Sequence, residues 1–489
     1  MSTSDDLHTI SVPSLSHRGE GVGKDEEGRA VFIPYAAPGD RLRVRDVEQQ
    51  KTFWRGEIED ILEASAFRVE PKCSFFGRCG GCAWQHVAFS QQLASKREHL
   101  REALRKVGQI TYEDEIELFS AQTPWQTRTR TRLQVDRAGR PAFFARGSNE
   151  RLTISSCPVL VPVLDAFVTA LHEHPLSQIE DLQEISLLAS SEGELAVALH
   201  LKEGKYASSF GWRRGVTDLL KLWRERGHQV AGVSIVSGLK RLGSLGSPWF
   251  DEGDPAVRIR PEGFSQASHT LNRVLVEQAL GLVDDWRGRQ VLEIYAGSGN
   301  FSLSMAAAGA HVLALESHPL AVEDAQEKAE AFPKNVRPTF RVFRDDKFDL
   351  KACWPSFRTP PEVLFVDHPE EASINVFANH SRSCSHRWCV WSLVFRRRLR
   401  VTCDFLWSLA TRSRRSKPSI LCPTRPTLRA WRCCVRSLLP RTKNVRLSYG
   451  KSTLEEFVLC TKRARLLRLK GLLSHVLCCV SYSLLLTGK

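Results

Sequence analysis

The chain has 489 residues, of which 42% are hydrophobic and 25% are charged. This length is sufficient for two to four domains with a buried core. The composition is that of a soluble globular protein. The opening residues, MSTSDDLHTI, lack the basic and apolar regions of a secretory signal. The nearest candidate for a membrane span, at 471–488, is short and interrupted by Ser and His. We therefore expect a cytoplasmic protein that does not contact a membrane.

The formal net charge of +14 is distributed unevenly along the chain. Residues 1–370 contain 45 Lys and Arg against 51 Asp and Glu, so this part carries a charge of −6. Residues 371–489 contain 24 basic and 4 acidic residues, a charge of +20. A basic excess indicates a nucleic-acid partner when it belongs to the folded body of a protein, but here it belongs to the last quarter alone.

The first half of the chain is dominated by predicted strands. Residues 10–69 contain short strand-like runs punctuated by glycine, with alternation in RLRVRDV after a PGD turn, and this pattern predicts a small β-barrel. A cysteine-rich segment follows at 73–82. Leucines at near-helical spacing predict an amphipathic helix over 89–108. From 109 onward short strand-like runs alternate with turns, so we expect residues 70–260 to form a central, strand-rich domain.

From residue 261 the pattern changes to alternating strands and helices. The run VLEIYAGSGNFSLSMAAAGAHVLALE consists of a strand, a glycine turn, a helix and a second strand that ends in an acid, and 362–367 add another buried strand. This alternation predicts an α/β domain with an open parallel sheet over 261–370. Residues 371–489 contain three glycines and follow neither periodicity. We expect them to form a basic, Cys- and Arg-rich tail that is disordered or comes from a shifted reading frame.

The glycine turn in LEIYAGSGN is the first candidate ligand site. Gly297 and Gly299 permit a tight turn and close approach of a ligand to the backbone at the start of a helix. Glu316 ends the next strand, where its carboxylate could accept both ribose hydroxyls of a nucleoside. A nicotinamide site would place a third glycine where Ser302 stands, so the pattern, with Glu293 ahead of it, favours S-adenosylmethionine. The alternative is an ordinary strand–helix turn without a ligand.

Four of the 14 cysteines lie before residue 350. They are Cys73, Cys79, Cys82 and Cys157. Disulfides are rare in cytosolic proteins, so one tetrathiolate metal site is favoured over two bridges or four buried structural thiols. The spacing C-x5-C-x2-C with a distant fourth cysteine differs from the paired C-x2-C motifs of zinc ribbons. The glycines leave backbone amides free to hydrogen-bond sulfur, so a [4Fe–4S] cluster is favoured over zinc.

A third candidate site is a row of alternating arginines in QTRTRTRLQV. On a strand, Arg128, Arg130 and Arg132 would project from one face, where they could bind RNA phosphates. A solvated edge strand is an equally good interpretation of this spacing.

The order of these segments resembles the TRAM-domain RNA (uracil-5-)methyltransferase family, in its iron–sulfur branch that acts on ribosomal RNA. SLSHRGEGVG and VFIPYAAPGDRLRV resemble its RNA-binding, OB-like TRAM barrel, and CSFFGRCGGCAWQH with Cys157 resembles its four cluster ligands. The resemblance covers residues 10 to about 369. It implies a Rossmann-like, S-adenosylmethionine-binding methyltransferase domain over 261–370, and a monomer that acts on structured ribosomal RNA of the 23S type. The implied cofactor-binding residues, taken from GFSQAS, IYAGSGNF, FRDDKF and FVDHPEE, are Gln266, Tyr295, Gly297, Gly299, Asn300, Glu316, Asp346 (or its neighbour Asp345) and Asp367.

The resemblance also implies covalent catalysis. In such enzymes a cysteine thiolate adds to C6 of uracil, C5 accepts the methyl group, and a base then removes the C5 proton. The target base must leave its stack to be reached. The family's S-C-D context is nearest to V-T-C-D, which makes Cys403 the candidate nucleophile, with Cys389 closer in spacing but in another context. TLEEFVL offers Glu456, or Glu455, as the base.

The chain departs from the family pattern directly after Asp367, where His368 and Glu370 replace the Pro and Arg of the family's D-P-P-R segment. Two other functions therefore stay open. One is an RNA-binding protein that keeps the barrel, the cluster and the cofactor pocket but has lost its chemistry. The other is a zinc-containing nicotinamide enzyme.

Overall fold

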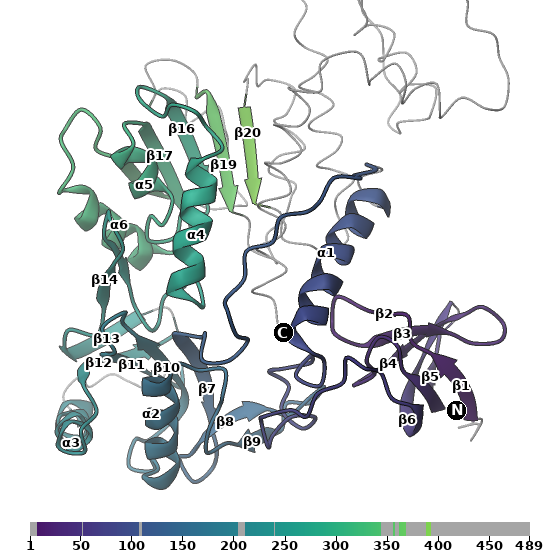
Figure 1. Cartoon of the computed structure of the whole chain (residues 1–489). Helices are drawn as coiled ribbons and strands as arrows, with labels where there is room; N and C mark the ends of the chain where they lie inside the picture. The colour runs from purple at the N-terminus through teal and green to yellow at the C-terminus, as the bar shows by residue number, and fades with distance from the viewer. Residues whose placement is uncertain are drawn as a thin grey trace, which may run out of the picture.

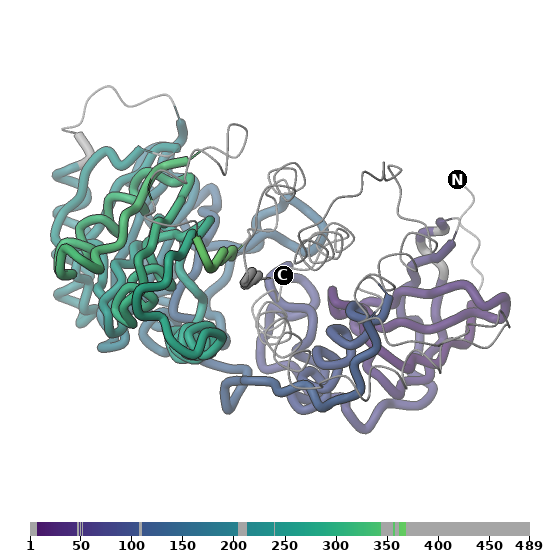
Figure 2. The backbone as a smooth tube through the Cα atoms, turned by 90° about the horizontal axis from the view of Figure 1, so that it is seen from above, coloured from purple at the N-terminus to yellow at the C-terminus, as the bar shows by residue number. Residues whose placement is uncertain are grey.

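The structure is a computed structural model that describes residues 7–50, 52–106, 110–203, 211–238, 240–343, 356, 361–367 and the backbone of 388–392. The predicted site residues Asp346, Cys403 and Glu456, with their alternatives Asp345 and Glu455, lie outside these residues. The described residues form three larger sheets and a short two-stranded one (Figure 1). In Figure 2 the N-terminal sheet and the α/β part occupy opposite ends of an elongated molecule, and the segment after α1 runs between them.

The N-terminal sheet has six strands in the order β1-β5-β6-β4-β3-β2. The strands are β1 (Leu7–Ser11), β2 (Ser14–Leu15), β3 (Gly21–Lys24), β4 (Ala30–Ile33), β5 (Arg41–Gln49) and β6 (Phe53–Glu63). Alternate residues such as Leu42 and Val44 are fully buried around Trp54, whose indole N–H donates to the Asp25 carboxylate at 2.9 Å. The predicted strand-rich N-terminus is confirmed, and so is the amphipathic helix, observed as α1 (Phe89–Lys106).

The central sheet has seven strands in the order β13-β12-β11-β10-β7-β8-β9. They are β7 (Arg130–Val135), β8 (Pro141–Phe144), β9 (Arg151–Thr153), β10 (Leu182–Ala189), β11 (Leu195–Leu201), β12 (Val230–Ser237) and β13 (Lys240–Gly246). Two helices, α2 (Pro162–Glu173) and α3 (Gly211–Glu225), pack their apolar side chains into one core with this sheet. The expectation of strands and turns alone was wrong here. The apolar spacing of Leu164, Phe167, Val168 and Leu171, directly after Pro162, is a helix signal.

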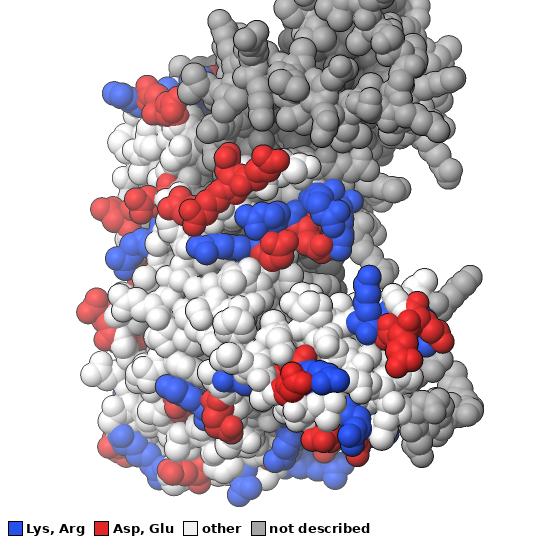
Figure 3. Space-filling view, turned by 45° about the vertical axis from the view of Figure 1, so that its right-hand side comes forward, with Lys and Arg blue, Asp and Glu red and all other residues white. Residues whose placement is uncertain are grey.

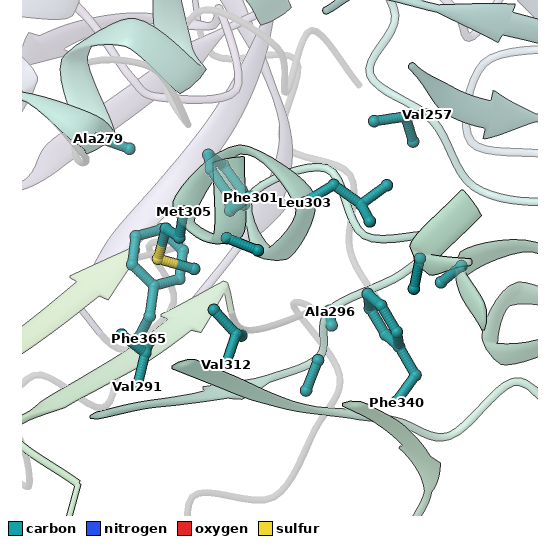
Figure 4. Close-up of a cluster of buried hydrophobic side chains, with 14 of the residues drawn as sticks. Val257, Ala279, Val291, Ala296, Phe301, Leu303, Met305, Val312, Phe340 and Phe365 are labelled. Carbon is teal, nitrogen blue, oxygen red and sulfur yellow. The ribbon is translucent and has the colours of Figure 1, made fainter. Parts of the chain in front are cut away.

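The α/β part contains a parallel five-stranded sheet in the order β18-β17-β16-β19-β20, as predicted. Its strands are β16 (Gln290–Ile294), β17 (His311–Glu316), β18 (Thr339–Val342), β19 (Val363–Asp367) and β20 (Trp388–Ser392), and its helices are α4 (His269–Leu280), α5 (Ser302–Ala307) and α6 (Pro319–Ala329). Figure 4 shows Phe301 and Met305 packed beside Phe365 of β19, and the two phenyl centroids are 4.8 Å apart. This core fixes the glycine turn after β16 above the carboxyl edge of the sheet, where ligands bind in such folds.

A short hairpin, β14 (Phe250–Glu252) and β15 (Val257–Ile259), joins the central sheet to α6 through ion pairs. The Arg260 guanidinium donates to both carboxylate oxygens of Asp324, from Nε to Oδ2 at 2.6 Å and from Nη2 to Oδ1 at 2.5 Å, and it lies 4.7 Å from the centroid of Trp249. Arg258 pairs with Glu327 and Asp251 in the same region. Both side chains of the Arg260–Asp324 pair are nearly buried, and the pair ties the segment after β15 to α6.

The charges on the described surface are mixed. In Figure 3, Lys and Arg side chains lie among Asp and Glu side chains, with no continuous basic face on the side shown. Among the described helices, none combines the length and the hydrophobicity that crossing a membrane requires.

Candidate functional site

A main cleft of about 1530 Å³ lies between the central sheet and the carboxyl edge of the α/β sheet. One wall is β7, the other is the glycine turn with the ends of β17 and β19, and the loop 263–267 borders both. The cysteine segment 73–82 lines the same space. The predicted site residues that line this cleft are Cys73, Cys79, Cys82, Arg128, Arg130, Arg132, Cys157, Gln266, Tyr295, Gly297, Glu316 and Asp367. The three predicted sites therefore open onto one cleft.

The glycine turn is built on left-handed backbone. Tyr295, Gly297 and Gly299 have φ values of 67°, 57° and 92°, in a region that favours glycine because a Cβ there meets the backbone. A Cβ added to Gly297 would meet no atom within 4 Å, so its backbone faces open space. A Cβ on Gly299 would lie 3.0 Å from Leu303 and Phe340. One glycine thus exposes the backbone to a ligand, while the other permits close packing underneath.

Glu316 fixes the turn from the neighbouring strand. Its carboxylate accepts the Gly297 N–H at 2.8 Å, the His318 N–H at 2.8 Å and the Ser317 hydroxyl at 3.0 Å. A carboxylate has about four lone-pair positions, so these bonds leave room for a further donor. This geometry suits a hydrogen bond from a ribose hydroxyl, and ribose binding by Glu316 stays a prediction.

Glu293, in the middle of β16, is completely buried beneath the turn. One carboxyl oxygen pairs with the Ser302 hydroxyl, and the other has no partner among the described residues. Burial, and to a smaller degree the nearby carboxylates Asp367 and Glu316, raises the pKa of Glu293 to about 8. Glu293 is therefore largely protonated at neutral pH and acts as a neutral hydrogen-bonding group.

The loop that carries Gln266 is held by Arg130. The Arg130 guanidinium donates to the carbonyl oxygens of Gly263 at 2.6 Å and Ser265 at 3.0 Å, and it lies 5.8 Å from the ring centroid of Phe264. Burial lowers the pKa of Arg130 to about 10, which leaves it charged at neutral pH. Arg130 thus positions the Gln266 loop, a role that its alternating sequence pattern did not indicate.

The other two arginines also differ from the pattern of one strand face. Arg128 precedes β7, because its backbone pairs with the segment around Leu160 rather than with the sheet. Arg132 lies on β7, where its side chain is largely exposed and its Nε donates to Glu184 at 2.7 Å. Phosphate binding by these arginines stays a prediction. Of the two arginines on β7, Arg132 has the more exposed guanidinium group.

Asn300 makes a reciprocal amide pair with Asn272 of α4. Each side-chain amide donates to the other's carbonyl oxygen at 2.9 Å. Because Ser268 caps the start of α4 two residues after Gln266, this pair connects the Gln266 loop to the glycine turn. Asn272 was missed at the sequence level, since an asparagine inside a helix carries no motif of its own.

The four cysteines gather where the N-terminal sheet meets the central sheet. The segment 73–82 is tied to the β8–β9 turn through the Gly80 N–H, which donates to the Phe144 carbonyl at 3.0 Å, and to the N-terminal sheet through the Tyr35 hydroxyl, which donates to the Gly77 carbonyl at 2.7 Å. The backbone N–H of Cys157 donates to Asp165 at 2.6 Å. All four cysteines are free thiols.

The electrostatics of these thiols reflect their proximity. Burial is the main cause that raises the pKa of Cys73, Cys79 and Cys157, the last to about 12, and the other cysteines of the group raise each of them further. Such thiols stay protonated unless a cation compensates their charge. The Gly81 N–H already points to the Cys79 sulfur at 3.4 Å. Within the described residues, however, no three His, Cys, Asp or Glu side chains are arranged to hold a metal ion.

Comparisons with known proteins agree with the order of these parts. The model of the tRNA (uracil-5-)-methyltransferase family matches residues 88–337, and that of the TRAM domain matches residues 8–58. The chain is 31% identical to the 23S rRNA (uracil(1939)-C(5))-methyltransferase RlmD of Halomonas elongata over 74% of this chain and 76% of that protein. It is 29% identical to the protein of the same name from Thiobacillus denitrificans, over 75% and 85% of the two chains.

A solved structure has the same overall architecture. The Pyrococcus abyssi tRNA (uracil-54, C5)-methyltransferase, determined in complex with S-adenosyl-L-homocysteine, superposes with a TM-score of 0.58 and covers 82% of this chain and 93% of that chain. At 19% identity this likeness establishes the fold alone. With the family model spanning half of the sequence, the chain belongs to the RNA (uracil-5-)methyltransferase enzymes that carry an N-terminal TRAM domain.

Proposed function

We propose that this enzyme transfers the methyl group of S-adenosylmethionine to C5 of a uracil in ribosomal RNA. The observation that carries the proposal is the main cleft, in which the glycine turn, the Gln266 loop and Asp367 face one space. The family match supplies the reaction type, and the relatives named for 23S rRNA favour ribosomal RNA as the substrate.

The described residues suit this cofactor. The open backbone at Gly297 and the free acceptor capacity of Glu316 would hold its nucleoside part. Bound S-adenosylmethionine would supply an electrophilic methyl group. Gln266 lies on the loop fixed by Arg130, where its amide could hydrogen-bond the bound cofactor. Asp367 ends β19 at the same edge of the sheet.

The nucleophile and the base are proposed to be Cys403 and Glu456, which lie outside the described residues. The backbone of β20 argues against Cys389. That residue pairs with Leu364, three positions before the pair formed by Asp367 and Ser392 at the carboxyl edge. With a rise of about 3.3 Å per residue, its backbone lies roughly 10 Å from the edge that borders the cleft.

The chemistry is tested by tritium release from RNA carrying 5-tritiated uridine, since methylation at C5 must expel that hydrogen. We expect release that depends on S-adenosylmethionine, persists in Cys389→Ala and disappears in Cys403→Ala. Release that survives Cys403→Ala but not Cys389→Ala would overturn the assignment of the nucleophile. No release from a protein that binds both RNA and cofactor would favour the alternative, an RNA-binding protein without catalysis, which the replacement of Pro and Arg by His368 and Glu370 supports.

We further propose that Cys73, Cys79, Cys82 and Cys157 ligate a [4Fe–4S] cluster. Support comes from four free thiols that interact electrostatically and from an amide directed at sulfur. A cluster binds each thiolate through a different iron, so its ligands stand further apart than the roughly 4 Å between sulfurs that share one zinc ion. This spacing is compatible with the lack of a single-ion arrangement in the described residues.

The cluster is tested by iron, sulfide and zinc analysis of anaerobically purified protein, together with its visible absorption. We expect about four irons and four sulfides per chain, and loss of both in Cys157→Ser. Stoichiometric zinc, or full iron content in Cys157→Ser, would contradict the proposal. Cys389→Ser is the matched control and should retain the iron.

A further inference from the structure

One face of the central sheet is polar, and His200 on this face has no role in the reaction described above. Strand register places Glu184 of β10 between Gln134 of β7 and His200 of β11, and it places Ser186 beside Arg132. Because side chains alternate along a strand, these residues share one face. The neighbouring residues Ile185, Leu187 and Leu199 lie in the core with α2 and α3 on the other face.

A side cavity of about 120 Å³ opens between this polar face and the start of α6. It shares Arg132, Glu262, His318 and Leu320 with the main cleft, so the two spaces are adjacent. His200, Val236 and Gly238 line the side cavity but not the main cleft. For scale, a cavity of roughly 150 Å³ in another protein accepts one benzene ring. The side cavity is smaller than this, but it shares four lining residues with the main cleft, so it can accept the edge of a planar ring that extends from that cleft.

The charges around the side cavity balance. Arg132 is paired with Glu184, and Glu262 accepts from Arg241 at 2.8 Å and from the Ser234 hydroxyl at 3.1 Å. The formal charges of these two arginines and two carboxylates sum to zero, so the cavity offers no net positive charge to a phosphate. It offers hydrogen-bonding groups and the apolar side chains of Val236 and Leu320.

His200 adds an uncharged hydrogen-bonding group to the side cavity. Its Nε2 lies 2.8 Å from the Ser186 hydroxyl. Burial, followed by the charge of Arg132, lowers the pKa of His200, so the ring is neutral at physiological pH. A neutral, polar and partly apolar cavity of this size matches a nucleobase better than a phosphate or an ion.

We propose that the side cavity binds one unpaired nucleobase that flanks the target uridine, and that it thereby helps to select the RNA sequence. This inference rests on the proposed function, because the RNA strand must enter the main cleft for a neighbouring base to reach the side cavity. Sequence-specific RNA recognition commonly reads unstacked bases by hydrogen bonds to their edges. The polar groups that would read the base are those of His200, Arg132 and Glu262.

Binding measurements test this without requiring turnover. A fluorescein-labelled 23S rRNA segment centred on the uracil that the relatives modify would be titrated with the full chain. Abasic units would replace, one at a time, the three nucleotides on either side of the target, which removes a base but keeps every phosphate. For the wild-type chain we expect one flanking position at which the loss of the base weakens binding by about tenfold, in the range of base contacts.

Val236→Phe fills the side cavity from β12, and it should weaken binding of the intact RNA by a similar factor while abolishing the effect of the abasic unit. His200→Gln, a second variant in case the first fails to fold, should reduce that effect. Val69→Phe is the matched control, since Val69 is exposed and lies outside both cavities, and it should keep the full effect. The affinity for S-adenosylhomocysteine should be unchanged in all three variants.

Three results would overturn the inference. The first is that no flanking position is sensitive to loss of its base in the wild-type chain. The second is that the effect of the abasic unit persists in Val236→Phe. The third is weaker S-adenosylhomocysteine binding in Val236→Phe, which would assign the side cavity to the cofactor. Failure of the proposed function would look different, because RNA binding with a flanking preference would remain while no tritium was released.

Discussion

Replacing Glu293 by Gln should stabilise the α/β part of the chain in a pH-dependent manner. Glu293 is fully buried, and its pKa is raised from the ordinary value of 4.5 to about 8. Below pH 4.5 the carboxyl is protonated in both the folded and the unfolded chain, so folding incurs no penalty. As the pH rises, the unfolded chain releases the proton first, and stability is lost progressively until the folded pKa is passed. Each pH unit in this window corresponds to about 1.4 kcal/mol.

At pH 7 this amounts to a destabilisation of about 3 kcal/mol in the wild-type chain, which Gln avoids because it is neutral and nearly isosteric. Gln can also donate to the Ser302 hydroxyl, as the protonated Glu293 can. The local stability of residues 290–307 would be followed by hydrogen-exchange mass spectrometry in urea from pH 5 to pH 8.5. Glu362→Gln is the control, because Glu362 is a partly exposed partner of Arg289 and should show no such gain.

We expect the free energy of unfolding of Glu293→Gln to exceed that of the wild type by less than about 1 kcal/mol at pH 5, and by more as the pH rises toward 8. An advantage that is independent of pH, or a variant that is less stable than wild type at pH 8, would refute the assignment of a buried, protonated carboxyl under the glycine turn.

Three further predictions concern the same framework. Arg260→Ala should lower the free energy of unfolding by about 3–5 kcal/mol, because it leaves the Asp324 carboxylate buried without its partner. In a thermal melt, replacing Asp324 by Leu as well should restore the melting temperature, and a melting temperature that stays low would contradict this reasoning. Gly299→Ala should weaken S-adenosylhomocysteine binding by at least about tenfold in calorimetry. Gly288 also has a positive φ but has open surroundings, so Gly288→Ala should only lower the free energy of unfolding, by roughly 1–2 kcal/mol. Asn272→Ala should reduce the rate of methyl transfer at saturating RNA with little change in the melting temperature, because it breaks the amide pair that connects the Gln266 loop to the turn; an unchanged rate would remove that role.

Local patterns in the sequence were sufficient to predict the α/β fold and the glycine turn. The turn depends on residues that are consecutive in the chain, so the strand, Gly297, Gly299 and the acid at Glu316 can all be identified without knowledge of tertiary contacts. The helix α1 was predictable for the same reason, because its leucines recur at helical spacing.

Tertiary contacts explain what the sequence did not reveal. The alternation of Arg130 and Arg132 predicted a shared strand face, but the surroundings of the two side chains differ, since Arg130 is buried against the Gln266 loop and Arg132 lies beside Glu184. Asn272 carries no motif of its own, and its partner Asn300 lies 28 residues further along the chain. The helix α2 was missed because a short buried helix and a buried strand have similar compositions, although the spacing of its apolar residues after Pro162 is helical.

The most direct test of the account is the appearance of 5-methyluridine in RNA. Unmodified 23S rRNA would be incubated with anaerobically purified protein and S-adenosylmethionine whose methyl group carries ¹³C, digested to nucleosides and examined by mass spectrometry. The account predicts ¹³C-labelled 5-methyluridine that depends on the protein and is strongly reduced in Gly299→Ala. Label found only in another methylated nucleoside, or no label although the protein binds both RNA and cofactor, would contradict it.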